Sequence, residues 1–382
     1  MPKQKIYYGR QFIDRSDIIE VSKSLKNDLI TTGNYVKKFE KKIKNFLKVK
    51  YTATCNNGTS ALHLSFLASD IKKGDVVIMP IINFISSYNM CMLLGAKIFF
   101  ADVDKQSGLI TPDAIIKCIK INKLKKVKAI VVQYMGGFPD HNEKFYEIKK
   151  KLKCLLIEDA CHAFGAKYTV KKKLYKIGSC KHADISAFSF HPLKPITTGE
   201  GGCVTTNNKN IFNKIIKFRS HGIVRDKRKH WNYDVETLGF NYRMSDINCA
   251  LGFSQIDKLN LFINKRKKIY NYYKLKLNNY KNLINFPKYD SKNHSSFHLV
   301  LINLNFKNLI KKNKFLNYMM KNRIFCQYHY IPLNKFSLIK KKTIHLSDYK
   351  TYFLKTVSIP IHHNLSFKDV NYVIEKIKKY FS

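Results

Sequence analysis

The sequence predicts an α/β protein, with a large domain built on a mostly parallel sheet and a smaller C-terminal α+β domain. In the first 250 residues, short continuous apolar runs alternate with helix-like stretches, as they do when helices cover both faces of a parallel sheet. Polar motifs directly follow several of these runs, at the strand ends where such sheets bind ligands. After residue 250 the chain becomes richer in long helical stretches with lysine and tyrosine. We therefore place the two domains at 1–250 and 251–382.

Each expected element follows from this pattern. In the large domain, the expected strands are Val76–Met79, Lys97–Phe100, Ala129–Val132 and Leu155–Ile157, and the expected helices are Ser60–Ser69 and Asn142–Lys153. In the small domain, we expect a helix at 254–280, a strand at 297–302, a helix at 306–321, a strand at 324–326 and a helix at 366–380.

The composition is that of a protein with a buried core and no membrane span. Apolar residues make up 45% of the 382, which is ordinary for a globular protein. The first ten residues lack the apolar stretch of a signal peptide. The longest apolar run, Val76–Ile82, contains Pro80 and is far too short to cross a bilayer. The nine cysteines are an odd number without a Cys-x-x-Cys pair, so we expect a cytosolic protein with neither disulfides nor a metal site.

The formal net charge of +44 raises the alternative of a basic nucleic-acid-binding protein. The excess is almost all lysine, whereas base-reading and phosphate-clamping sites favour arginine. It is also spread along the whole chain instead of forming one arm or tail. We therefore favour a protein with a lysine-covered surface and no nucleic-acid partner. Attraction of an anionic substrate by this surface would be a by-product.

The first motif is Asn57-Gly58-Thr59-Ser60, which precedes an apolar helical stretch. A glycine and two hydroxyl residues at a helix start leave backbone N–H groups free to bind a phosphate. The same pattern also begins many helices that bind nothing.

The second motif places Glu158 and Asp159 at the end of an apolar run, with His162 three residues later. Paired acids at a strand end are typical of catalytic or metal sites, and equally of helix caps. A buried aspartate is also the residue that pairs with the protonated ring nitrogen of a pyridine cofactor.

The third motif contains Lys194, which lies between Pro192 and Pro195 after a strand that ends at Ser189. The prolines stiffen its backbone, and its neighbours are apolar. A desolvated lysine loses its charge and becomes the amine that a Schiff base requires. This surrounding separates Lys194 from the many lysines of the surface.

Taken together, the three motifs resemble the DegT/DnrJ/EryC1/StrS family of sugar aminotransferases, which are fold-type I pyridoxal-phosphate enzymes. The match continues through Thr197-Thr198-Gly199-Glu200-Gly201-Gly202, Arg219-Ser220-His221-Gly222 and Gly239-Phe240-Asn241-Tyr242-Arg243-Met244. It runs in order from about Tyr8 to about Leu365. The resemblance implies the aspartate aminotransferase-like fold and pyridoxal 5′-phosphate as cofactor. It also implies a homodimer with shared active sites.

The resemblance also implies a role for each matching residue. Lys194 would carry the cofactor as a Schiff base, Asp159 would pair with the pyridine nitrogen, and His162 would lie near the ring hydroxyl. Phe84 would stack on the ring. The alternatives are that His162 caps a helix and that Phe84 belongs to the core. The phosphate would be held by Gly58, Thr59, Ser60 and Ser189, and by Asn241 from a second subunit.

A finer resemblance concerns the substrate. The run from Ser189 to Thr198 resembles the members that aminate C4 of a UDP-linked 4-keto-6-deoxy-N-acetyl sugar in pseudaminic acid biosynthesis, with L-glutamate as the usual donor. Other members act on dTDP-, GDP- or 3-keto sugars, and these stay open as alternatives. Members with histidine at the Schiff-base position are dehydratases, so Lys194 favours transamination. The expected substrate-side residues are Tyr8, Thr31, Arg243, His329 and Tyr330.

Overall fold

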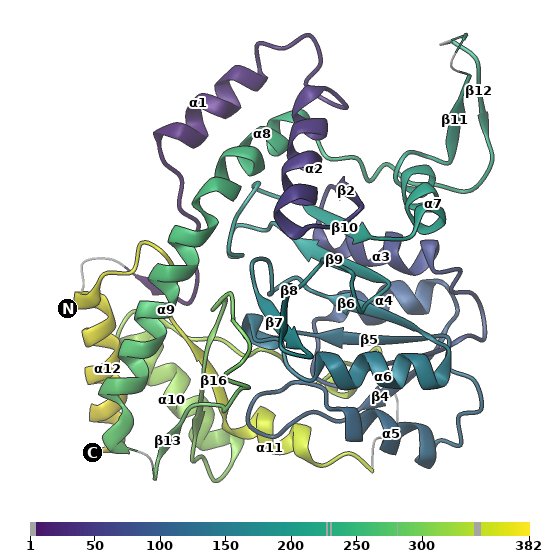
Figure 1. Cartoon of the computed structure of the whole chain (residues 1–382). Coiled ribbons are helices and arrows are strands. Elements are labelled where there is room, and N and C mark those ends of the chain that lie inside the picture. The colour runs from purple at the N-terminus through teal and green to yellow at the C-terminus, as the bar shows by residue number, and fades with distance from the viewer. Residues whose placement is uncertain (1–4, 227, 230, 281, 340–344) are drawn as a thin grey trace.

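A computed structural model describes residues 5–226, 228–229, 231–280, 282–339 and 345–382. Its centre is a seven-stranded sheet with the strand order β2-β10-β9-β6-β5-β3-β4 (Figure 1). All pairs from β9 to β4 are parallel. β10 is antiparallel to both β9 and β2, so β2 runs in the same direction as the parallel strands. The strands are β2 (Tyr51–Cys55), β3 (Val76–Pro80), β4 (Lys97–Ala101), β5 (Ala129–Gln133), β6 (Leu155–Asp159), β9 (Ile185–Ser189) and β10 (Gly202–Thr206).

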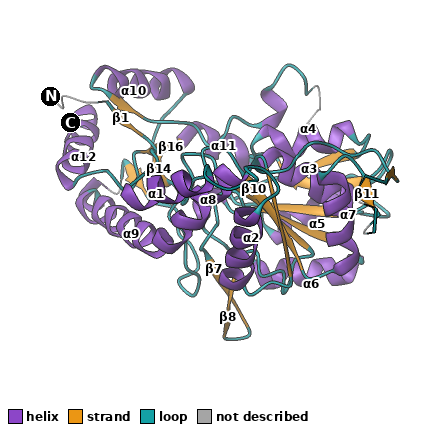
Figure 2. Cartoon of the chain, turned by 90° about the horizontal axis from the view of Figure 1, so that it is seen from above, coloured by secondary structure: helices purple, strands orange, loops and turns teal. Residues whose placement is uncertain are grey.

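Helices cover both faces of this sheet (Figure 2). The pleat directs alternate side chains to opposite faces, so that Ile78 of β3 packs in one core while Val77 and Met79 pack in the other. The first core contains side chains of α2 (Asn34–Leu47), α5 (Pro112–Ile121), α6 (Asn142–Leu152) and α8 (Asp246–Gln255). The second contains side chains of α3 (Gly58–Ala68), α4 (Ile85–Leu93) and α7 (Lys209–Arg219). Burial on both faces explains why the strands are continuous apolar runs.

The C-terminal region has its own core around a three-stranded sheet of order β13-β14-β16. Its antiparallel strands are β13 (Ile284–Asn285), β14 (Val300–Leu304) and β16 (Thr356–Ile359). The helices here are α9 (Leu259–Lys276), α10 (Leu309–Lys321), α11 (Asp348–Lys355) and α12 (Phe367–Phe381). Three of them, α9, α10 and α12, gather on one side of the molecule in Figure 1.

The N-terminal segment joins this C-terminal region. β1 (Ile6–Tyr7) pairs in parallel with β15 (Ile324–Phe325), and Ile6 packs in the C-terminal core. α1 (Arg15–Ser24) then lies against α8. The domain boundary expected at residue 250 stays a prediction. The first described residues of the chain pack with the C-terminal region, on the other side of that boundary.

Besides the β1–β15 pair, two hairpins lie outside the two main sheets. One consists of β7 (Lys167–Val170) and β8 (Lys173–Lys176). The other, β11 (Ile223–Arg225) and β12 (Tyr233–Val235), projects from the end of the molecule opposite the C-terminal helices (Figure 1). None of the described helices is long and apolar enough to cross a membrane.

The structure contains the expected elements, with shifted ends in the C-terminal half. All four expected strands of the large domain are present, as are its two helices. The helix expected at 254–280 is two helices, because α8 ends at Gln255 and α9 begins at Leu259 after a 3-10 turn. The strand expected at 297–302 is β14, which begins only at Val300.

Candidate active site

A cavity of about 480 Å³ opens at the carboxyl edge of the central sheet. Residues that end or follow β2, β3, β5, β6 and β9 line it. These strands share one direction, so their carboxyl ends meet at the same edge. We call this cavity the lysine pocket, because Lys194 lies in it.

The start of α3 forms one wall of the lysine pocket and is suited to bind a phosphate. The Asn57 side chain caps the helix by accepting the N–H of Ser60 at 2.8 Å. A Cβ atom on Gly58 would lie 2.7 Å from the Cβ of Ser189, so only glycine lets the backbone approach Ser189 this closely. The Thr59 and Ser86 hydroxyls are 2.8 Å apart. Free N–H groups and hydroxyls thus face a space that would hold an anion.

Asp159 and its neighbour Glu158 end β6 and point to opposite faces of the sheet. Asp159 lines the lysine pocket and is 2% exposed. Its carboxylate accepts the Ser87 hydroxyl at 3.2 Å and the Cys161 N–H at 3.3 Å. Glu158 lies in the interior behind the sheet, where it accepts the Tyr134 hydroxyl at 2.7 Å. Burial raises the pKa of both carboxyls.

Lys194 lies in a loop that is closed by backbone hydrogen bonds. The Lys194 N–H donates to His191 at 2.9 Å, and the Thr198 N–H donates to Phe190 at 2.9 Å. Burial of the Lys194 amine lowers its pKa, and the nearby Cys161 and Asp159 raise it. A lowered pKa favours the neutral amine, which is the form that can form an imine and move protons.

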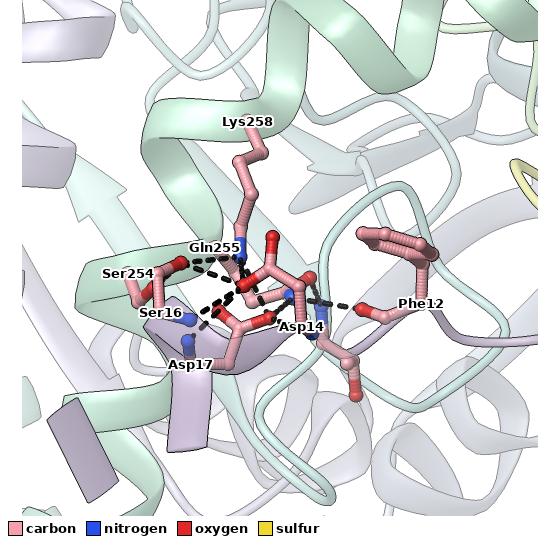
Figure 3. Close-up of polar contacts among 8 residues, drawn as sticks. Phe12, Asp14, Ser16, Asp17, Ser254, Gln255 and Lys258 are labelled. Atoms are coloured by element: carbon pink, nitrogen blue, oxygen red, sulfur yellow. Dashed lines mark hydrogen bonds and ion pairs between the residues drawn. The ribbon is translucent and has the colours of Figure 1, made fainter. Parts of the chain in front are cut away.

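Gln255 anchors the far end of this loop to the N-terminal segment. Its amide oxygen accepts the Thr197 N–H at 3.4 Å, and its NH₂ group donates to the Phe12 carbonyl at 2.9 Å and to Asp17 at 2.7 Å. Lys258 lies 2.7 Å from the same Asp17 carboxylate, as Figure 3 shows. Three segments far apart in the sequence therefore fix the position of the Lys194 loop.

Histidine and aromatic side chains form another part of the lining. The Tyr330 hydroxyl lies 2.8 Å from Nε2 of His162, and its ring lies 5.7 Å from that of Phe84. The Tyr8 and His329 rings meet edge to face at 5.2 Å. Burial, followed by the charge of Lys194, lowers the pKa of His162 well below its usual range and that of His329 to about 3. Both imidazoles are therefore neutral.

The lysine pocket gathers ten of the fourteen residues expected from the sequence. They are Tyr8, Gly58, Thr59, Phe84, Asp159, His162, Ser189, Lys194, His329 and Tyr330. Ser60 is buried just behind the helix start. Phe84 is 52% exposed, so it does not belong to the core.

The other three expected residues, Thr31, Asn241 and Arg243, lie outside the lysine pocket. We call them the outer face. Thr31 pairs with Ser245 through an isolated bridge, and the exposed Asn241 accepts the Asn56 side-chain amide through its carbonyl at 3.5 Å. Asp246 holds the Thr31 loop in place, because its carboxylate accepts the N–H groups of Gly33 and Val36 at 3.1 and 3.0 Å.

Sequence reasoning missed several residues that line the lysine pocket. They are Asn57, Leu62, Ser86, Gln133, Cys161, His191, Leu193, Glu200 and His298. Gln133 ends β5, so the rule that polar residues at strand ends face ligands would have found it. Nothing in the sequence around His298 distinguishes this residue from those of the strand that follows it, β14.

The residues of the lysine pocket fit pyridoxal 5′-phosphate. The Gly58 helix start and the Ser189 hydroxyl suit its phosphate, and Asp159 suits a protonated pyridine nitrogen. Nδ1 of His162 is buried and has no hydrogen-bond partner among the described residues, so it is free to meet a ring hydroxyl. No group of His, Cys, Asp and Glu side chains suited to a metal ion occurs in the described ranges.

A lysine with a buried amine, a buried aspartate and an anion cradle at the carboxyl edge of such a sheet are the features of a pyridoxal-phosphate-dependent aminotransferase. The sequence profile of the DegT/DnrJ/EryC1/StrS aminotransferase family matches residues 11–378, and the chain belongs to this family.

Similar proteins agree with this assignment. A UDP-4-amino-4,6-dideoxy-N-acetyl-beta-L-altrosamine transaminase of Campylobacter jejuni is 36% identical over 98% of this chain and 99% of its own. A GDP-perosamine synthase of Escherichia coli O157:H7 is 30% identical over 92% of this chain and 91% of its own. The structure of Helicobacter pylori PseC, an aminotransferase involved in the biosynthesis of pseudoaminic acid, superposes with a TM-score of 0.88 at 28% identity, covering 99% of each chain.

Proposed function

We propose that this enzyme transfers the amino group of L-glutamate to C4 of a UDP-linked 4-keto-6-deoxy-N-acetyl sugar, a step in a pseudaminic acid-type pathway. The meeting of the Lys194 amine and the Asp159 carboxylate in one pocket supports the aminotransferase chemistry. The full-length similarity to a UDP-sugar transaminase supports this substrate over the GDP-sugar alternative, whose enzyme is less similar.

Bound pyridoxal 5′-phosphate would carry the amino group from donor to acceptor and stabilise negative charge at the reacting carbon. The chain's own residues would do the rest. Gly58, Thr59 and Ser189 would hold the phosphate, and Phe84 would cover one face of the ring. Asp159 would keep the ring nitrogen protonated. Nζ of Lys194, when released as a neutral amine, would take the proton from the α-carbon of glutamate and later deliver one to C4 of the sugar.

We also propose that the enzyme works as a homodimer with shared active sites. In the described part of the chain, the lining of the lysine pocket includes one lysine, Lys194, and no arginine, beside the carboxylates of Asp159 and Glu200. A sugar diphosphate and a dicarboxylate donor require cations for tight binding. The outer face of a second subunit would supply Arg243, together with Asn241 at the phosphate.

A substrate panel tests the proposed reaction. Purified protein loaded with pyridoxal 5′-phosphate would be incubated with L-glutamate and UDP-, dTDP- and GDP-linked 4-keto sugars, and with dTDP-3-keto sugars, while 2-oxoglutarate is measured. We expect the UDP-4-keto-6-deoxy-N-acetyl sugar to give the highest kcat/KM. Turnover with only a GDP- or dTDP-linked sugar would overturn the substrate proposal and leave the aminotransferase class intact.

A further inference from the structure

The Asp159 carboxylate is held in the interior without an ion pair to lysine or arginine among the described residues. It is 2% exposed, and burial favours the neutral form of a carboxyl group. A neutral carboxyl group could not keep a pyridine nitrogen protonated. The structure must therefore stabilise the ionised form through hydrogen-bond donors.

Both oxygens of this carboxylate accept a hydrogen bond, and the Cys161 thiol also interacts with it. The Cys161 N–H donates to Oδ1 at 3.3 Å, and the Ser87 hydroxyl donates to Oδ2 at 3.2 Å. The Cys161 N–H belongs to the turn after β6, so it comes with the backbone of Asp159 itself. Ser87 comes from a different element, α4, and is 0% exposed. Its hydroxyl is therefore the contact that ties the carboxylate to another part of the fold.

The first turn of α4 supports the cofactor site at three points. Phe84, the N-cap residue of α4, lines the lysine pocket. Ser86 meets the Thr59 hydroxyl at 2.8 Å, at the phosphate end. Ser87 meets Asp159, at the opposite, ring-nitrogen end. One rigid helix start thus links the ring face, the phosphate cradle and the acid.

We propose that Ser87 is a positioning residue that holds Asp159 ionised and directed at the ring nitrogen of the cofactor. The inference rests on the role of Asp159 in the proposed function. Burial raises the pKa of Asp159, while the hydrogen bonds from Cys161, the charge of Lys194 and the hydrogen bond from Ser87 lower it. The titratable groups that interact with Asp159 are Lys194, Cys161 and Tyr330, whereas Ser87 contributes an uncharged hydroxyl from another element, α4.

The test compares Ser87→Ala with wild type by two measurements that require no sugar substrate. The first is the Kd of the cofactor-free protein for pyridoxal 5′-phosphate, which we expect to rise about tenfold when a hydrogen bond to a charged group is lost. The second is the pH midpoint at which the visible absorbance of the loaded protein changes. We expect it to rise by about half a pH unit. The reason is that a cofactor ring with a less firmly held positive charge repels the proton on the Lys194 nitrogen less, so that this proton is lost at a higher pH.

Ser65→Ala is the matched control, because Ser65 is equally buried and its hydroxyl donates within α3 to Ala61 at 2.7 Å. Ser87→Thr keeps the hydroxyl and should restore the midpoint. Suppose that Ser87→Ala has the same Kd and pH midpoint as Ser65→Ala, while Asp159→Asn changes both. The proposed role of Ser87 is then wrong, and the assignment of Asp159 stands. If Asp159→Asn also shifts neither, the assignment of Asp159 fails as well.

Discussion

The lysine pocket and the outer face differ in burial and in charge. Asp159 and His162 in the pocket are each 2% exposed, and the lining carries two carboxylates and one lysine. Thr31 and Asn241 on the outer face are exposed, and Arg243 is half-buried. This difference is the basis of the division of labour that we propose for the homodimer. The pocket of one chain would hold most of the cofactor, and the outer face of its partner would complete the phosphate site and bind the anionic substrate.

The most damaging change to the pocket side of this comparison is Lys194→Ala. Removing the amine removes both the covalent anchor and the proton carrier, so we expect kcat to fall by at least about 10⁴-fold. Borohydride should fix the cofactor covalently to wild-type protein and not to the variant. Peptide mass mapping identifies the lysine that carries the label. Covalent labelling at another lysine would contradict the assignment.

The outer face is tested by mixing two inactive variants. We expect Asn241→Ala/Arg243→Ala to lower kcat/KM by about 10²-fold, because phosphate contacts to a cation and an amide are lost. If the outer face serves the partner, a mixed dimer of this variant with Lys194→Ala contains one intact site. Statistical mixing should then restore about one quarter of wild-type activity.

The mixing experiment has a clear opposite outcome. If both residues act within their own chain, every site in a mixed dimer carries one defect, and the mixture stays as inactive as its parents. That result would remove the division of labour between chains while leaving the cofactor chemistry in place.

Gly33→Ala perturbs the outer face without touching the pocket. A Cβ atom at Gly33 would lie 2.3 Å from Oδ2 of Asp246 and 2.8 Å from the Leu29 carbonyl, so the Thr31 loop must shift. We expect KM for the UDP sugar to rise about fivefold and the free energy of unfolding to fall by about 1–2 kcal/mol. The Kd for pyridoxal 5′-phosphate should stay unchanged. The exposed neighbour Asn34, changed to alanine, is the control.

The smallest expected effect concerns the lysine-rich surface as a whole. A net charge of +44 attracts a diphosphate substrate at long range, and added salt weakens this attraction. We expect kcat/KM to fall about threefold between about 50 and 300 mM NaCl, with kcat unchanged. A salt-independent kcat/KM would show that the lysine excess does not assist substrate capture.

The three motifs of the sequence meet in the lysine pocket because each of them lies at the end of a strand. Asp159 and Ser189 end strands of one direction, so parallel topology brings them together. Glu158 shows the limit of that reasoning. Glu158 stands beside Asp159 in the same motif. Only the pleat of β6 directs Asp159 into the pocket and Glu158 into the interior behind the sheet.

His298 could not be predicted because its segment looks like a strand and is a loop. Phe297 adopts a φ of 50°, which interrupts an extended chain. The N–H groups of Ser296 and His298 donate to Gly137 and Gly136 at 3.0 and 2.9 Å instead of forming a ladder. These tertiary contacts turn the His298 side chain into the lysine pocket. Local apolar pattern contains no information about such contacts.

The Gln255 amide has a consequence for the order in which the molecule is completed. It binds Thr197 of the Lys194 loop and the N-terminal residues Phe12 and Asp17, while His329 and Tyr330 reach the same pocket from near the C-terminus. Domains fold during synthesis from the N-terminus, so a nascent chain can form most of the central sheet before this amide leaves the ribosome. The strands of the sheet are therefore available for pairing before the lysine pocket can be completed. The Lys194 loop can be anchored only once Gln255 has been synthesised, and the pocket is complete only once Tyr330 has been synthesised.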